Sequence, residues 1–249
     1  MTTPTDILRA LHVPGDPLVL VNAWDVASAR EVEAAGAAAV ATSSAAIAAS
    51  LGLPDDNSSD PDTVFAAIGR IAAATSLPVT ADVEGGYGLD GMTLVERLLA
   101  AGAAGCNIED SDHRRPGSLV DPEAQAERLA GIRSAARHRG VDVVLNARID
   151  VLFHRPDDDP AALLDEVLAR ARLYVEAGAD CVYPIRLATP ALVERLVAEL
   201  GAPVNANLGP ATTVKDLAAA GASRISIGPM AHRQAMSALA THARTLLGA

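Results

Sequence analysis

The stretch AAGAAGC, residues 100–106, shows how this chain alternates between two kinds of element. Small helix-forming residues lead to Gly102 and an apolar run follows it, as expected where a helix ends at a glycine and a strand begins. The same pattern recurs as AAGAAAV (34–40), EAGADCV (176–182) and AAGASRI (219–225). The spacing of the four glycines accommodates one or two βα units in each interval, so the pattern predicts a repeated βα architecture.

Eight short apolar runs are predicted as strands, and eight helical runs separate them. The predicted strands are Leu18–Asn22, Ala38–Thr42, Val79–Val83, Gly105–Glu109, Val143–Arg148, Cys181–Pro184, Val204–Asn207 and Arg224–Ile227. The predicted helices are Val26–Ala35, Pro61–Thr75, Met92–Ala101, Pro122–His138, Ala161–Ala177, Pro190–Leu200, Thr213–Ala220 and Met230–Leu247.

This alternation favours the α/β class and a (β/α)₈ TIM barrel, formed by residues 1–249 as a single domain. The alternative is a doubly wound open sheet, but no Gly-x-Gly-x-x-Gly follows the first strand to support it. Residues 43–60 and 110–121 are expected to be long polar loops after the second and fourth strands, where functional groups are often placed.

Composition excludes several classes of function. The net charge is -11 and Arg114-Arg115 is the only Arg-Arg pair, so nucleic acid is not expected as a partner. The chain has no apolar run of the length that spans a membrane and no signal-peptide pattern, which predicts a cytoplasmic protein. Lys215 is the single lysine and is expected on a helix surface, which argues against Schiff-base chemistry. Cys106 and Cys181 lie in apolar runs and are expected to be buried, reduced thiols.

Polar side chains gather where the predicted strands end, which is where barrel enzymes place their active sites. In TADVEGGYG (80–88), Asp82 and Glu84 are two residues apart and therefore face the same side. Glu109 comes from the next strand and is expected to converge with them. Three carboxylates without nearby His or Cys favour Mg²⁺ or Mn²⁺. The alternative is that these acids pair with Arg148, which otherwise suits the capture of a carboxylate or phosphate.

Taken together, NAWDVASAR, TSSAAIAASLGLPDDN, TADVEGGYG, CNIEDS and NARIDVL resemble the isocitrate lyase / phosphoenolpyruvate mutase superfamily, from about Leu18 to Leu208. The resemblance implies a (β/α)₈ barrel that uses Mg²⁺ to bind 2-oxo acids and to stabilise their enolates. It also implies a homo-oligomer, a dimer or tetramer, which in some members exchanges the last helix.

The resemblance assigns roles to individual positions. Asp82, Glu84 and Glu109 match the acids of the metal site, and Arg148 matches an arginine that binds the substrate carboxylate. Asp55 matches an acid near the substrate. The remaining substrate-binding positions are Ser43, Ser44, Ala45 and Asn207.

The chain departs from the specialised branches of this superfamily. The loop EDSDHRRPGSLVD (109–121) has neither the Lys-x-Cys-Gly of the lyases nor the Lys-x-Asn of the mutases. Ile185 stands where the lyases have glutamate and the mutases have histidine. The proton donor is therefore open, and His113 and Arg115 are the candidates.

Three functions remain possible from the sequence. The first is a Mg²⁺-dependent C–C lyase or decarboxylase that acts on a 2-oxo acid resembling oxaloacetate. The second is P–C chemistry on phosphonates, for which Arg114, Arg115 and Arg186 would bind the phosphoryl group. The third is a non-catalytic protein that binds small dicarboxylates.

Overall fold

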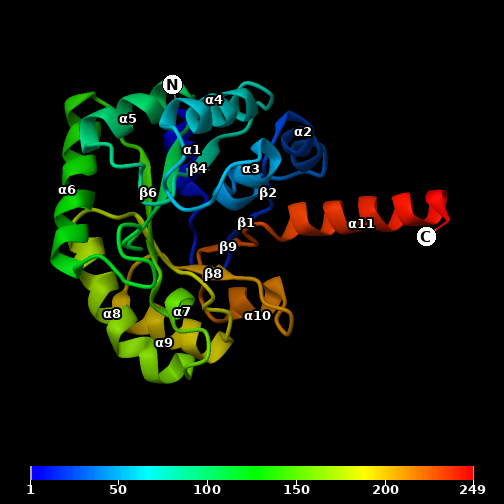
Figure 1. Ribbon diagram of the computed structural model, residues 1–249. Helices are drawn as coiled ribbons and strands as arrows, with labels where there is room; N and C mark the ends of the chain where they lie inside the picture. The colour runs from blue at the N-terminus through cyan, green and yellow to red at the C-terminus, as the bar shows by residue number, and fades with distance from the viewer. Residues whose placement is uncertain (1, 249) are drawn as a thin grey trace.

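The computed structural model describes residues 2–248, and its strands lie at the centre of a ring of helices (Figure 1). The strands are β1 Leu18–Leu20, β2 Asn22–Ala23, β3 Val40–Thr42, β4 Val79–Asp82, β5 Gly105–Glu109, β6 Val144–Ile149, β7 Cys181–Pro184, β8 Asn205–Asn207 and β9 Arg224–Ser226. The helices are α1 Pro4–Ala10, α2 Val26–Ala34, α3 Ser44–Leu51, α4 Pro61–Ala72, α5 Gly91–Ala100, α6 Pro122–His138, α7 Val151–His154, α8 Pro160–Glu176, α9 Pro190–Leu200, α10 Val214–Ala219 and α11 Met230–Leu247.

The strands are parallel and follow one another around a closed ring. One row runs β2-β3-β4-β5-β6-β7 and a second runs β1-β9-β8. The parallel bridge between Val182 and Val204 joins β7 to β8. β1 and β2 are consecutive pieces of one strand, interrupted only at Val21, so they join the two rows at the other side. The predicted (β/α)₈ barrel is confirmed.

The structure contains three helices that the sequence pattern did not predict: α1, α3 and α7. The expectation that residues 43–60 form a loop throughout was wrong, because α3 occupies its first half. Ser43 begins this helix, since its hydroxyl accepts a hydrogen bond from the Ala46 N–H at 3.4 Å. The alanine-rich sequence that follows favours a helix. Because α3 is short, its sequence shows too few turns for a helical periodicity to be recognised.

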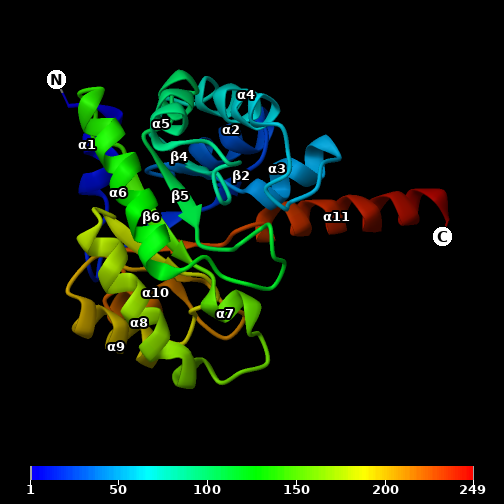
Figure 2. The ribbon, with the colours of Figure 1, turned by 60° about the vertical axis from the view of Figure 1, so that its left-hand side comes forward.

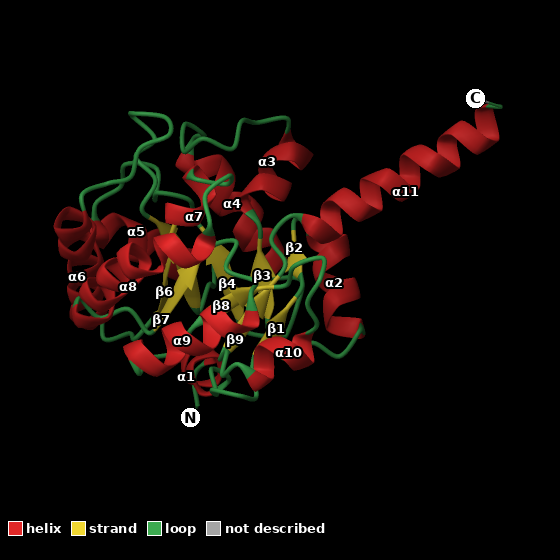
Figure 3. Ribbon diagram, turned by 90° about the horizontal axis from the view of Figure 1, so that it is seen from below, coloured by secondary structure: helices red, strands yellow, loops and turns green. Residues whose placement is uncertain are grey.

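Helix α1 closes the end of the barrel at which the strands begin. Leu8 is fully buried there and packs in a cluster with Leu18, Ala39 and Val144. Seen from below, α1 lies on the opposite side of the strands from α3 and α7 (Figure 3). The opposite end of the barrel, where the strands have their C-terminal ends, is therefore not covered by α1 and carries the side chains that follow the strands.

Helix α11 differs from the other outer helices because it projects away from the barrel (Figures 1 and 2). None of its residues is buried in the single chain. Elsewhere the helices pack apolar faces on the strands, as Ile68 of α4 and Leu98 of α5 do.

Both cysteines are free and buried, as predicted. Burial raises the pKa of each thiol to about 12. Within the described chain, no helix is long and apolar enough to cross a membrane.

Candidate active site

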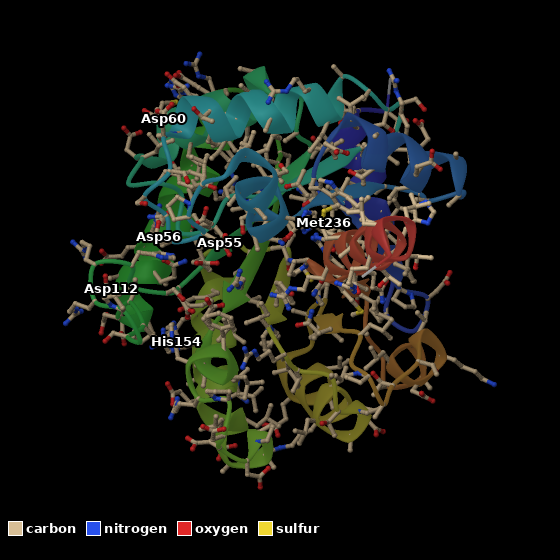
Figure 4. All side chains as sticks on the ribbon, turned by 45° about the vertical axis from the view of Figure 1, so that its right-hand side comes forward. Asp55, Asp56, Asp60, Asp112, His154 and Met236 are labelled. Atoms are coloured by element: carbon tan, nitrogen blue, oxygen red, sulfur yellow. The ribbon has the colours of Figure 1, made fainter. Side chains whose placement is uncertain are left out.

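A cavity of about 340 Å³ opens where β4, β5 and β6 end. Its size is within the usual range for small-molecule sites. Figure 4 labels Asp55, Asp56, Asp112 and His154, which lie on the same side of the molecule. The cavity is lined by Ser44, Asp55, Asp56, Ser58, Glu84, Glu109, Ser111, Asp112, His113, Pro116, Gly117, Arg148, Phe153 and His154.

Asp82 ends β4 and is held by residues of β3 and α3. Its N–H donates to Thr42 Oγ1 at 2.9 Å. Its Oδ2 accepts hydrogen bonds from the Ser44 N–H at 3.1 Å and from the Ser44 hydroxyl at 3.0 Å. The other oxygen, Oδ1, is buried and has no hydrogen-bond partner among residues 2–248. A buried carboxylate oxygen of this kind is costly unless a cation or donor meets it.

Glu84 has a strained backbone that its neighbours stabilise. Its φ of 49° is unusual for a side chain with a Cβ, and Asn57 and Tyr87 share this left-handed region. The carboxylate accepts hydrogen bonds from the Asn57 N–H and from the Tyr87 hydroxyl, the latter at 3.0 Å. Burial, together with the negative charge of Asp55, raises the pKa of Glu84 to about 7.

Glu109 lies between two basic side chains. Arg148 Nη1 is 2.6 Å from Glu109 Oε2, and His113 Nε2 is 2.7 Å from Glu109 Oε1. Burial raises the pKa of Glu109 although Arg148 opposes that change. The hydrogen bond to Glu109 raises the pKa of His113.

Arg148 is fixed by a second acid, Asp150, which is fully buried. Arg148 Nε and Nη2 donate to the two oxygens of Asp150 at 2.7 and 3.0 Å. The Ser111 hydroxyl also donates to Asp150 Oδ2 at 2.6 Å, and its oxygen lies 2.8 Å from His154 Nε2. Because the Asp150 carboxylate contacts Ser111 and Arg148 and not the ring of His154, this group lacks the acid–histidine contact of a nucleophilic Ser-His-Asp triad.

A further buried network supports Asp150 from behind. The Asp150 N–H donates to Asp110 Oδ1 at 2.8 Å. The other oxygen of Asp110 accepts hydrogen bonds from the Tyr174 hydroxyl at 2.7 Å and from Arg170 at 3.0 Å. The orientation of Arg148 therefore depends on β5, β6 and α8 together.

Most predicted site residues converge on this cavity. Ser44, Asp55, Glu84, Glu109, His113 and Arg148 line it. Asp82 adjoins it through Ser44, and Ser43 and Ala45 lie at the start of α3.

Arg115 and Asn207 have contacts elsewhere. Arg115 is bound to Asp112 at 2.8 Å, and its side chain is 73% exposed. The amide oxygen of Asn207 accepts the Arg186 N–H at 2.6 Å, and its amide nitrogen donates to the Tyr183 hydroxyl at 2.9 Å. Catalysis by Arg115 and substrate binding by Asn207 stay predictions.

The ion-pair alternative for the three acids applies to Glu109 alone. Asp82 and Glu84 make no ion pair with Arg148. Over the described residues, no three acidic, histidine or cysteine side chains are already close enough to hold a metal. Glu109 contacts Arg148 and His113, and Glu84 is hydrogen-bonded to Asn57 and Tyr87.

Sequence reasoning missed several residues of this site. Asp150 was visible in NARID as a strand-end acid two residues after Arg148, a spacing that places both side chains on one face. No local signal indicates Ser111, His154 or Asn57, because the contact between Ser111 and His154 spans 43 residues and that between Asn57 and Glu84 spans 27. Tyr87 lies within TADVEGGYG, but its contact with Glu84 three residues away depends on the left-handed turn of this loop.

Buried acids and a fixed arginine at the C-terminal ends of the strands are typical of (β/α)₈ barrel enzymes. Comparison with known proteins places the chain in a family. Residues 8–247 match the family model described as phosphoenolpyruvate phosphomutase. The chain belongs to this family and to the isocitrate lyase / phosphoenolpyruvate mutase superfamily.

Individual relatives cover nearly the whole chain. It is 42% identical, with a TM-score of 0.89, to a crystal structure from Burkholderia cenocepacia J2315 of a protein classed with the phosphonomutases, covering 97% of this chain and 99% of that one. It is 30% identical to 2-methylisocitrate lyase of Escherichia coli K12, over 98% of this chain and 84% of the lyase. It is 26% identical, with a TM-score of 0.84, to phosphonopyruvate hydrolase in complex with oxalate and Mg²⁺, covering 99% and 88%.

Proposed function

We propose that the protein is a divalent-metal-dependent enzyme that breaks or forms a C–C bond next to the oxo group of a 2-oxo acid, as a lyase or decarboxylase. The observation that supports this most directly is the buried Oδ1 of Asp82, which has no hydrogen-bond partner among residues 2–248 and belongs to the same strand-end rim as Glu84 and Glu109. Family membership adds the lyase, mutase and hydrolase relatives, which act on C–C or P–C bonds.

The residues at this position fit a hard cation such as Mg²⁺ or Mn²⁺. Burial raises the pKa of Glu84, Glu109 and Asp55, so the protein's own cations do not fully compensate the negative charge. Oxygen ligands alone suit these metals, which retain several waters. Asp82, Glu84 and Glu109 would hold the ion, directly or through water. When bound, a divalent cation stabilises the negative charge that develops on the oxo oxygen as the bond breaks.

The chain's own residues would orient the substrate. Arg148 is held in one plane by Asp150 and Glu109, which prepares it to bind a carboxylate with two parallel hydrogen bonds. The N–H group of Ala45 lies in the first turn of α3, where no carbonyl of the helix can accept it, so it suits an oxyanion, whereas the Ser44 N–H is bound to Asp82 Oδ2. His113 lines the cavity, with its Nε2 bonded to Glu109, and is the proposed proton donor to the enolate.

We also propose that two copies associate through α11. This helix carries an apolar stripe with Met236 43% and Leu239 60% exposed. A hollow of about 1010 Å³ lies between α2, β1 and the first half of α11, and it is lined by apolar side chains such as Val19, Trp24 and Met236. The chain therefore has both an uncovered apolar helix and an uncovered apolar groove, and a second copy could supply the missing half of each.

A binding experiment tests the enzymatic proposal. Thermal stability would be measured with oxalate, pyruvate and oxaloacetate, each with Mg²⁺ and with EDTA, because a ligand that binds the folded state raises the melting temperature. We expect oxalate to stabilise the protein in Mg²⁺ and to lose that effect in EDTA.

Two variants make the result specific to the site. Asp82→Asn should abolish the Mg²⁺-dependent shift, whereas Asp157→Asn, an exposed acid in the loop after α7, should retain it. The absence of any shift in the unmodified protein with Mg²⁺ would contradict the proposal. A shift without turnover of any 2-oxo acid would instead favour the non-catalytic binder.

A further inference from the structure

Arg186 differs from the other arginines near the cavity because its guanidinium group has no acidic partner. Arg148 contacts Glu109 and Asp150. Arg114 and Arg115 both contact Asp112. Within residues 2–248, no carboxylate lies in ion-pair distance of Arg186, which follows β7. Its positive charge is therefore available to a ligand.

The backbone of Arg186 is held in an unusual conformation. Its φ is 71°, in the left-handed region that long side chains rarely adopt. The Arg186 N–H donates to Asn207 Oδ1 at 2.6 Å, and Asn207 is in turn held by Tyr183. The other non-glycine residues with positive φ are Asn57, Glu84 and Tyr87 at the acidic side of the site. Strain of this kind persists where the surrounding contacts enforce it, commonly at functional sites.

The guanidinium group of Arg186 lies over Phe153, a side chain that lines the cavity. The Arg186 guanidinium carbon lies 4.8 Å from the centre of the Phe153 ring, and that of Arg148 lies 5.5 Å from the same centre. Phe153 lines the cavity and is 40% exposed. A guanidinium group stacked on a ring keeps its N–H edge free, so it can still bind an anion with two hydrogen bonds.

We propose that Arg186 and Phe153 form a second anion-binding subsite, which receives an anionic group at the far end of the substrate. The ligand is then a 2-oxo acid with a second carboxylate or a phosphonate. This inference rests on the proposed function, in which Arg148 binds the first carboxylate. The acids Asp55, Asp56 and Glu84 also line the cavity and would repel a second negative group, which favours its binding at Arg186.

The test compares ligands with and without the second group. Dissociation constants would be measured by thermal-shift titration in Mg²⁺ for oxalate and pyruvate, and for oxaloacetate and phosphonopyruvate. In Arg186→Gln, affinity for at least one of the last two should fall about tenfold or more, because a charge-assisted bidentate contact is lost. Affinity for oxalate and pyruvate should change by less than about twofold. Arg186→Lys should give an intermediate loss, since it keeps the charge without the planar stack.

The control is Arg137→Gln, which makes the same change in net charge at the exposed end of α6, far from the strand ends. It should leave all four affinities unchanged. Loss for oxaloacetate alone identifies a carboxylate, and loss for phosphonopyruvate alone identifies a phosphonate. Equal effects on all four ligands, or no effect on any, overturn the subsite while oxalate binding still supports the proposed function. An unmodified protein that binds none of the four overturns both.

Discussion

At the scale of single residues, the most important feature of the site is that hydrogen bonds hold the Arg148 side chain in one conformation. Arg148 has its three donor nitrogens committed to Glu109 and Asp150, and both acids are buried. Such an arginine loses little entropy when it binds a carboxylate, because the protein has already ordered it. We therefore expect the fixed orientation of Arg148 to matter more for substrate binding than the net charge of Arg148 and its two acids.

Asp150→Asn tests that argument. The amide has only one acceptor oxygen, so Arg148 loses one of its two parallel hydrogen bonds and meets an amide N–H instead. We expect kcat/KM to fall by about 100-fold, mainly through KM, as a misplaced positioning group commonly causes. The measurement is steady-state kinetics on whichever 2-oxo acid is turned over.

A matched variant separates this effect from a general loss of charge. Asp142→Asn removes an acid that also contacts an arginine, Arg133, but on the outside of the barrel, and it should leave KM unchanged. If Asp150→Asn has the KM of the unmodified enzyme, Glu109 alone positions Arg148.

His12, just after α1, provides a second residue-scale prediction, because it is largely buried in a neutral form. Its Nδ1 lies 2.8 Å from the Leu8 carbonyl oxygen, and its Nε2 is buried with no hydrogen-bond partner among residues 2–248. Burial, with the nearby charge of Arg224, lowers the pKa of His12 to about 4 from 6.5.

Acidification should therefore weaken the fold through this histidine. Between pH 6.5 and pH 4 the unfolded chain binds the proton and the folded chain does not, so the free energy of unfolding falls as the pH falls. By pH 5 the loss from this group is about 2 kcal/mol. Urea denaturation at pH 7 and pH 5 should show that loss as the difference between the unmodified protein and His12→Gln, because the raised pKa of Glu84 stabilises both proteins over the same range. His138→Gln, at the exposed end of α6, is the control, and identical pH dependence in all three proteins would exclude His12.

At the scale of elements, the barrel is tight where α1 closes it. Gly105 on β5 has no room for a side chain: a Cβ there would lie 2.6 Å from the Val144 carbonyl oxygen and 2.8 Å from the Val144 Cβ. Both atoms belong to the adjacent strand β6, so neither can rotate away.

Gly105→Ala should therefore destabilise the protein by about 3 kcal/mol, because relieving the overlap requires strands to separate. Chemical denaturation provides the measurement. Gly131→Ala is the matched control: it lies in α6 with nothing within 4 Å of an added Cβ. Alanine should raise stability there by up to about 1 kcal/mol, since it favours helix over glycine. A Gly105→Ala protein as stable as the original would show that β5 and β6 can shift.

The elements also show how far the sequence could predict this structure. The order of βα units follows from the repeated glycine stops, and the acids and Arg148 at the strand ends follow from strand alternation. Helix α3 could not be predicted with assurance, because eight residues carry too little periodicity. Arg224 was predicted in a strand, but its full burial beside Asn107 depends on the closed barrel, which brings together residues separated by 117 positions.

At the scale of the whole molecule, α11 is the feature that a single chain leaves incomplete. Apolar side chains recur along it at the spacing of one helix face, ending with Leu246 at 72% exposure. An apolar surface of this extent is unusual on a monomer and commonly marks an interface. If α11 of each copy lies in the groove beside α2 and β1 of the other, two equivalent contacts form and the assembly closes as a dimer.

The mass in solution should therefore be twice the 25.5 kDa of the chain, or a multiple of that dimer. Light scattering on a sizing column measures it. Placing a charge on the apolar face, as in Met236→Asp with Leu239→Asp, should yield a monomer, since burying two unpaired carboxylates is costly. Thr241→Asp introduces a charge on the polar face of the same helix and should preserve the dimer. A monomeric unmodified protein would instead mean that α11 folds back over the groove of its own chain, and the Met236→Asp and Leu239→Asp pair would then lower stability without changing the mass.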